Sequence, residues 1–248
     1  MLPPVDIRYI ADESARLGDE IQRAADESSE PIDPRPEVLN IGLRNLLDAL
    51  RDAEADTMAA SAHALRERTG SEPDALLAHG IDLLSQLSGL AARLHQPQAA
   101  GGAERLTLPL ACWLMRRGAE LVFPEPVVNA AAALANGLHE PDDLAGLYAM
   151  MSEVVDGVSP LRMQDGEGAD PSRPWRVLLL NRAIVATRSH RPALMVEAFQ
   201  SVCEHLPDDA PGFFREGMGQ MEALNYPQPV REVMARFYHL WCAGQRLH

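Results

Sequence analysis

The sequence contains no lysine, because all 22 of its basic residues are arginines. A lysine amino group reacts with substrate in Schiff-base and pyridoxal-phosphate enzymes, and it holds nucleotide phosphates in P-loop proteins and kinases. The missing residue type therefore excludes these classes of enzyme. Exclusive use of arginine is typical of a protein encoded by a GC-rich genome.

Aromatic residues are scarce, at 5% of the chain, and runs of valine, isoleucine and threonine are nearly absent. Both kinds of residue are enriched in β-strands, so their scarcity argues against a β-protein. Apolar residues still make up 46% of the 248 residues, and alanine and leucine dominate them. This composition is typical of a helical protein with one large domain or two small ones.

Cysteines and long apolar segments are also few. Cys112, Cys203 and Cys242 are odd in number and widely spaced, which predicts reduced core residues and no disulfide framework or zinc site. No uncharged apolar run of 18 residues occurs, and the first residues lack the basic segment of a signal peptide. We therefore expect a cytoplasmic protein with no cofactor and no membrane partner.

Positive charge is in short supply over most of the chain. The net charge is −14. Residues 169–248, with 8 acidic residues and 9 arginines, are the only part of the sequence that is not acidic overall. Nucleic acids and anionic membranes are bound by clustered cations, so neither is expected as a partner. The C-terminal third is the region where an acidic partner would find positive charge.

Proline is abundant, and it marks the expected helix starts. Helices are predicted near 174–189, 192–206, 211–224 and 229–243, each with proline in its first turn. Pro174 and Pro211 are 37 residues apart, as are Pro192 and Pro229. A two-helix unit that recurs at a fixed interval predicts stacked helical hairpins.

The preceding residues also have helical patterns. We predict an acidic N-terminal segment in 1–35, with an arm in 1–10 and a helix in 11–28. A helical hairpin or bundle is predicted in 36–100, where Leu39, Leu43, Leu46 and Leu50 form an apolar stripe. The glycine-rich segment 96–102 is the expected domain boundary. Residues 101–248 would form helical-hairpin repeats, with helices near 104–122, 126–139 and 141–157 and a polar loop at 159–173. The fold expected is all-α, a short α-solenoid of antiparallel hairpins.

One segment resembles a known repeat family. Phe213, Gly217 and Tyr226 resemble the first helix and inter-helix turn of a tetratricopeptide-type repeat, and Leu206-Pro-Asp-Asp resembles the end of such a repeat. The interval of 37 residues instead of 34, and Pro229 in place of a small alanine, depart from that pattern. The resemblance implies a scaffold that binds peptides in a concave groove, with Gly217 at a close contact between helices.

The strongest acidic pattern consists of Asp48, Asp52 and Asp56, spaced four residues apart on one helix face. Paired aspartates on helices hold the Mg²⁺ ions of diphosphate-using isoprenoid enzymes. No second acidic helix with three carboxylates accompanies them, so a solvated face opposite the leucine stripe is the simpler interpretation. A metal and diphosphate site on these three residues remains the alternative hypothesis.

No other catalytic motif stands out. The eight histidines lack the Glu-x-x-His and His-Glu-x-x-His spacings of metal sites, and no Gly-x-Ser-x-Gly sequence occurs. We predict a non-catalytic cytoplasmic scaffold that binds another protein or peptide, and a homodimer is a further possibility because Phe237 and Trp241 lie at helical spacing. The predicted groove residues come from the C-terminal third: Arg176, Arg182, Arg188, Phe213 and Tyr226.

Overall fold

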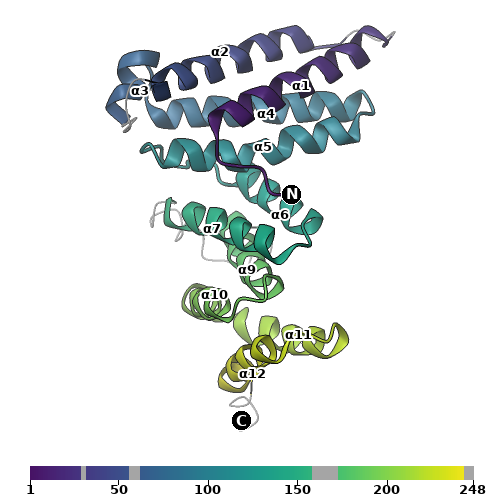
Figure 1. Cartoon of the computed structure of the whole chain (residues 1–248), viewed down its shortest axis with the longest axis vertical. Helices are drawn as coiled ribbons and strands as arrows, with labels where there is room; N and C mark the ends of the chain where they lie inside the picture. The colour runs from purple at the N-terminus through teal and green to yellow at the C-terminus, as the bar shows by residue number, and fades with distance from the viewer. Residues whose placement is uncertain (29–31, 56–61, 158–172, 243–248) are drawn as a thin grey trace. The chain divides into compact units, whose positions relative to one another are not determined.

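The structure, a computed structural model, describes residues 1–28, 32–55, 62–157 and 173–242. This part of the chain contains eleven α-helices, packed in adjacent pairs, and no β-strand (Figure 1), which confirms the all-α hairpin prediction. The helices are α1 (Ile7–Asp26), α2 (Pro36–Ala55), α3 (Ala62–Thr69), α4 (Pro73–Arg93), α5 (Pro97–Met115), α6 (Glu125–Gly137), α7 (Pro141–Gly157), α9 (Pro174–Arg188), α10 (Pro192–His205), α11 (Ala210–Ala223) and α12 (Gln228–Cys242).

Proline occupies the first or second position of most of these helices, as the sequence predicts. The first-turn N–H has no partner within a helix, so proline loses nothing there, and its fixed φ favours the helical conformation. The four C-terminal helices begin and end within one residue of the expected bounds. Proline placement was therefore a sound guide to the helix starts.

Two helices differ from the expected bounds. Helix α1 begins at Ile7 and not at residue 11, because the Asp6 carboxylate caps it by accepting hydrogen bonds from the N–H groups of Arg8 (2.8 Å) and Tyr9 (3.0 Å). Helix α5 begins at Pro97, so the expected boundary at 96–102 is instead its first turns. Gly102 is buried there against α1, and a Cβ atom on it would lie 2.7 Å from Cδ2 of Leu17.

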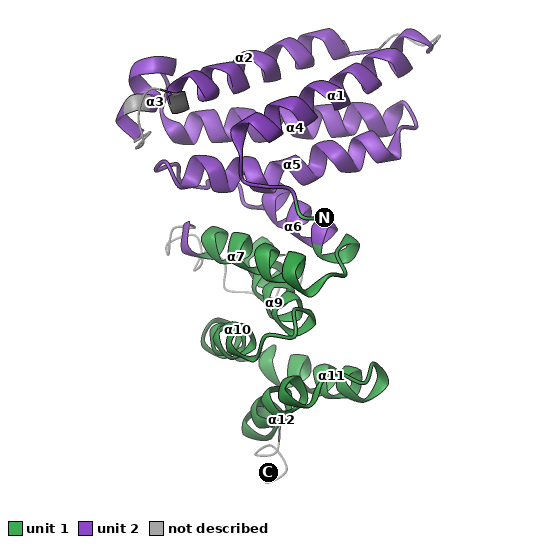
Figure 2. Ribbon diagram, viewed as in Figure 1, with its two compact units in different colours: residues 1–2, 135–155, 168–248 green, residues 3–134, 156–167 purple. Residues whose placement is uncertain are grey.

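The chain forms two compact units, which divide within α6 between Leu134 and Ala135 (Figure 2). One unit holds α1–α5 and most of α6. The other holds the end of α6, most of α7, helices α9–α12 and the first two residues of the chain. The predicted division at residue 100 therefore falls inside α5.

The larger unit is built on a four-helix bundle. Helix α1 packs on α2, α2 on α4, α4 on α5, and α5 returns to α1 (Figure 1). The leucine stripe of α2 faces this core: Leu39, Leu43 and Leu50 are buried. Among the described helices, α4 has the length and mean hydropathy of a membrane-spanning segment, although half of that window is buried in the protein. Core helices of soluble proteins pass the same test.

The smaller unit contains two helical hairpins, α9–α10 and α11–α12. Their second helices, α10 and α12, pack on each other around an aromatic core. Phe199 is fully buried, and its ring contacts those of Phe213, Phe214 and Phe237 edge to face, with centroids 5.6, 5.2 and 5.2 Å away. This cluster joins the two hairpins on the α10–α12 side and leaves room on the α9–α11 side.

Candidate functional site

A groove of about 280 Å³ lies between α9 and α11, the first helices of the two hairpins. The turn after α11 and one residue of α12 complete its wall. We call it the α9–α11 groove. Its lining residues are Ile184, Thr187, Arg188, Phe213, Glu216, Gly217, Gln220, Met221, Leu224, Tyr226 and Met234.

The apolar part of the groove is partly exposed. Ile184 and Leu224 are 44% and 63% exposed, although most large aliphatic side chains of this unit are buried. The Phe213 ring is held from behind by the aromatic core, at 5.6 Å from Phe199. Gly217 faces Met234, whose Cε would lie 2.6 Å from a Cβ on the glycine, so α11 and α12 meet closely there. The groove thus combines a rigid wall with solvent-facing apolar side chains.

Two hydrogen-bond donors lie among these apolar side chains. Arg188 is half-buried, and its guanidinium donates to the carbonyl oxygens of Ala135 and Leu138 at the end of α6. Burial raises the pKa of the Tyr226 phenol, and the positive charge of Arg188 opposes that shift. Tyr226 is therefore protonated at neutral pH and able to donate, and its ring lies 5.4 Å from that of His190, edge to face.

The structure brings together three of the five predicted groove residues, Arg188, Phe213 and Tyr226, and separates the other two. Arg176 binds Asp209 through two hydrogen bonds, from Nε at 2.9 Å and from an Nη at 2.7 Å. Arg182 is only 5% exposed. Both side chains are committed to contacts within the protein, so neither lines the groove as expected.

Arg182 lies at the centre of a polar cluster and is itself buried. Its guanidinium donates to the carboxylate of Glu197, the hydroxyl of Tyr148 and the hydroxyl of Ser152, and it stacks over the Tyr148 ring at 4.7 Å. Burial, the main cause, raises the pKa of Tyr148 to about 12. The cluster ties α7 to α9 and α10, so the role of Arg182 is structural.

Four apolar groove residues were not predicted: Ile184, Met221, Leu224 and Met234. The sequence contains a signal for two of them, Met221 and Leu224. They continue the helical spacing of Phe213 and Gly217 along α11. Such a stripe is equally typical of a buried core, and only the structure reveals that part of it faces the groove.

Two of the three predicted metal residues, Asp48 and Asp52, lie on α2, in the larger unit. Asp48 and Asp52 are exposed on the face opposite the leucine stripe, and Asp48 pairs with Arg51 at 3.4 Å. Asp56 lies outside the described residues. Within the described ranges, no group of three His, Cys, Asp or Glu side chains could hold a metal ion. The metal and diphosphate hypothesis thus receives no support from the part of the chain described.

A second, shallower hollow lies between α10 and α12, where Cys203 is near Leu240 and Trp241. Burial, and to a lesser degree Glu204, raises the pKa of the Cys203 thiol to about 11. At pH 8 its reactive thiolate fraction should be about 100-fold smaller than that of an ordinary thiol.

We expect iodoacetamide to alkylate Cys203 correspondingly slowly at pH 8. Below pH 11 the rate should rise about tenfold for each pH unit, because the thiolate fraction does. Mass spectrometry of the tryptic or chymotryptic fragment that contains Cys203 measures this rate. The control is the same measurement on the protein unfolded in 8 M urea. A rate equal to that in urea would contradict a protected thiol.

Comparison with known proteins adds no identification. No family model matches the chain, no curated protein is similar to it, and no solved structure matches it. A functional assignment must therefore rest on the residues of the α9–α11 groove themselves.

Proposed function

We propose that the protein is a non-catalytic, cytoplasmic interaction module whose α9–α11 groove binds a segment of another protein. One observation carries the proposal: Arg188, Phe213 and Tyr226 line a groove whose rim exposes Ile184 and Leu224. Large aliphatic side chains held at a concave surface gain free energy when a partner covers them. The tetratricopeptide-like pattern on α11 agrees with this use, because those scaffolds bind peptides in a groove.

The chemistry of the groove describes the segment that fits. Its apolar wall accommodates one or two aliphatic side chains, and a cavity of 280 Å³ is of a suitable size. Arg188 has two carbonyl partners but no carboxylate partner among the described residues, and it lies near the protonated Tyr226 phenol. A peptide with an acidic residue next to its aliphatic anchor would place a carboxylate near these two donors.

The lining residues favour binding over catalysis. They include one arginine, one tyrosine and one glutamate, but no histidine and no cysteine. The hydroxyl of Thr187 donates to the carbonyl oxygen of Ala183. The groove therefore lacks a nucleophile paired with a base, which acyl-transfer and related reactions need.

Selection from a random peptide library tests the proposal. We expect the full chain to enrich peptides with an aliphatic residue flanked by an acidic one. Leu224→Asp should lower the affinity for the selected peptides by about 10–100-fold, because it removes an apolar contact and places a carboxylate next to the acidic residue of the peptide. Affinities by fluorescence anisotropy measure this loss.

Leu240→Asp is the matched control, since Leu240 is 70% exposed but lies on α12 outside the groove. It should leave peptide affinity unchanged. Selected peptides that bind Leu224→Asp as tightly as the unmodified protein would refute the proposal, and so would failure to enrich any peptide. If the bound species proves to be a second copy of the chain, sedimentation of the protein alone would reveal a dimer that Leu224→Asp dissociates.

A further inference from the structure

An exposed aromatic ring lies at the turn between α5 and α6, in the larger unit. Among the described residues Phe123 is the only phenylalanine, tyrosine or tryptophan that is exposed, at 66%. The backbone around it is held in place, because Leu121 is 1% exposed and the N–H of Glu120 donates to the Asp74 carboxylate at 2.7 Å. The ring is therefore presented on a fixed turn, and a partner that covers it has little chain to order.

Two carboxylates flank this ring. Glu120 and Glu125 are exposed, and neither side chain forms a hydrogen bond or an ion pair with another described residue. An apolar side chain next to unpaired acids is the combination that the α9–α11 groove accommodates, because Arg188 and Tyr226 lie beside its apolar wall.

The α9–α11 groove has suitable partners for an aromatic ring as well as for an aliphatic side chain. Phe213, Met221 and Met234 line it. Aromatic rings attract one another edge to face, and methionine sulfur makes favourable contacts with rings. An incoming phenylalanine would therefore find both kinds of contact in the groove.

The corresponding turn of the smaller unit shows a similar aromatic residue that is covered. Phe123-Pro-Glu-Pro-Val precedes α6, and Tyr226-Pro-Gln-Pro-Val precedes α12, with each aromatic residue two positions before the helix. Tyr226 is half-buried as part of the groove, whereas Phe123 is exposed. This difference between two similar turns indicates that a partner from outside the larger unit covers Phe123.

Net charge favours contact between unlike units. Residues 3–134, which form most of the larger unit, hold 21 acidic residues and 12 arginines. Residues 169–248 hold 8 acidic residues and 9 arginines. Contact between two larger units would bring two acidic surfaces together, whereas contact between a larger and a smaller unit does not.

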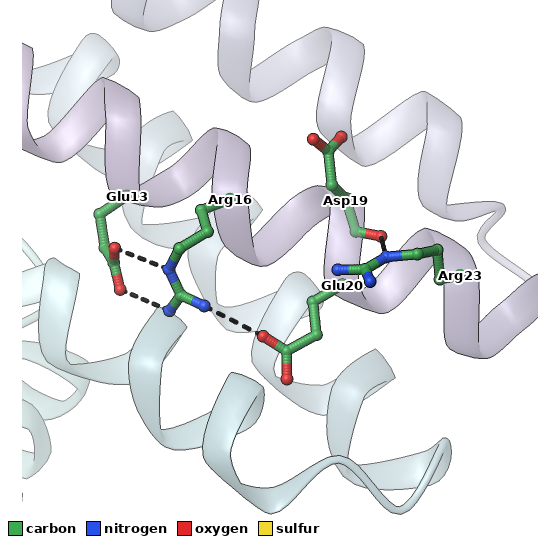
Figure 3. Close-up of polar contacts among 5 residues, drawn as sticks. All are labelled: Glu13, Arg16, Asp19, Glu20 and Arg23. Carbon is green, nitrogen blue, oxygen red and sulfur yellow. Dashed lines mark hydrogen bonds and ion pairs between the residues drawn. The ribbon is translucent and has the colours of Figure 1, made fainter.

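The acidic surface of α1 lacks the combination found at the Phe123 turn. Arg16 binds Glu13 at 2.7 Å and Glu20 at 3.1 Å, so two of its acids are already paired (Figure 3). The large aliphatic residues of α1 are all buried, and its acids therefore have no exposed apolar neighbour.

Helix α2 has exposed apolar residues but no free acid beside them. Val38 and Ile41 are 62% and 55% exposed. The adjacent Glu37 accepts a hydrogen bond from Gln22 at 3.3 Å. The Phe123 turn is thus the surface of the larger unit that best fits the groove.

We propose that the partner of the α9–α11 groove is a second copy of this chain, which inserts its Phe123 ring into the groove. Glu120 or Glu125 of the incoming turn then faces Arg188, which has no carboxylate partner among the described residues. Glu216 is the one acid of the groove, so the incoming glutamates lie on the Arg188 side. This inference rests on the proposed function, because it names the partner of the same groove.

Each copy carries one groove and one Phe123 turn, on different surfaces. An interface between unlike surfaces leaves one of each free, so copies add head to tail until a ring closes. The contact is small and centred on one ring. We therefore expect a Kd of about 10–100 µM and assembly that increases with protein concentration.

Sedimentation of the full chain at about 5 µM and about 300 µM measures this assembly. The 27.1 kDa chain should be monomeric at the lower concentration and at least double its average mass at the higher one. Phe123→Asp and Leu224→Asp should each stay monomeric, because each removes one of the two contacting surfaces. Both side chains are more than 60% exposed, so urea denaturation should show unchanged stability.

A mixture of the two variants identifies the contact. Phe123→Asp keeps an intact groove and Leu224→Asp keeps an intact turn, so an equimolar mixture should form a complex of one copy of each and no larger species. A contact through any other pair of surfaces would not give this pattern. Mixed variants that remain monomeric would overturn the proposal, and so would assembly that persists in either single variant.

Charge-removing variants test the role of the flanking acids. Glu120→Gln combined with Glu125→Gln should lower the affinity between copies by about tenfold. Glu13→Gln combined with Glu20→Gln, on α1, is the matched control and should leave it unchanged, as should Ile41→Asp on α2. An equal loss for the two glutamine pairs would show that Glu120 and Glu125 do not contact the groove.

The results separate this inference from the proposed function. A chain that stays monomeric, while library peptides still bind in a manner sensitive to Leu224→Asp, overturns the choice of partner and leaves the peptide-binding function intact. If neither library peptides nor a second copy binds, both proposals fail.

Discussion

Phe199→Ala should lower the free energy of unfolding of the smaller unit by about 3–5 kcal/mol, the largest loss we expect from a single substitution. Phe199 is fully buried, and its ring meets three others at centroid distances of 5.2–5.6 Å. Truncation removes the apolar area and leaves a cavity between α10, α11 and α12. It also removes the edge-to-face contacts, which add about 0.5–1.5 kcal/mol per pair.

The measurement is urea denaturation combined with native-state hydrogen exchange of the amides in α10–α12. Exchange resolves the smaller unit separately, which matters because a chain with two compact units need not unfold in one step. Leu240→Ala, on α12 but 70% exposed, is the control and should change stability by less than about 0.5 kcal/mol. If Phe199→Ala and Leu240→Ala lowered the free energy of unfolding equally, the aromatic cluster around Phe199 would not be the stabilising core of this unit.

The helices themselves could be predicted from local signals. Proline in the first turn and apolar residues at helical spacing place α9–α12 almost to the residue, because both act within one helix. The same local logic failed at α5. Glycine and alanine in 97–102 have the composition of a linker, yet they form helix because Gly102 allows a close approach to Leu17 on α1. That contact joins segments some 85 residues apart, and a single sequence does not reveal it.

Part of the candidate groove could also be predicted, because some of its residues follow a local pattern. Phe213 and Tyr226 could be found because they follow a repeat-like pattern along the chain. Arg182 and Arg188 both looked like available positive charge, and only their partners distinguish them. Arg182 is buried against Glu197 and Tyr148, whereas Arg188 reaches the groove. Charge can be read from sequence, but the pairing of a charge depends on tertiary contacts.

Substitutions in the Arg182 cluster should also lower the free energy of unfolding substantially. The losses should differ between its two charged members, Arg182 and Glu197, because their exposures differ. Arg182 is 5% exposed, while the side chain of Glu197 is 59% exposed. Removing the carboxylate by Glu197→Ala leaves a buried guanidinium whose other described partners, Tyr148 and Ser152, are neutral. We expect a loss of about 2–3 kcal/mol, below the 3–5 kcal/mol typical of a fully buried pair, because water screens the Glu197 side.

Arg182→Met should be milder, at about 1–2 kcal/mol, although it removes more hydrogen bonds. Methionine fills the space of the arginine stem, and the exposed Glu197 carboxylate stays hydrated when its partner is lost. The Ser152 hydroxyl keeps its bond to the carbonyl oxygen of Tyr148. The buried charge itself, and not the loss of contacts, is what makes Glu197→Ala costly.

A double-mutant cycle measured by urea denaturation decides whether the unpaired buried charge or the loss of hydrogen bonds causes the destabilisation. Adding Glu197→Ala to Arg182→Met should cost less than about 0.5 kcal/mol, because no buried cation remains to be left unpaired. Glu232→Ala, which removes an exposed acid of α12 that accepts a hydrogen bond from Gln228, is the matched control for loss of a surface carboxylate. If Arg182→Met proves more damaging than Glu197→Ala, the hydrogen bonds of the guanidinium to Tyr148 and Ser152 dominate, and the cluster is held together by those bonds and not by charge pairing.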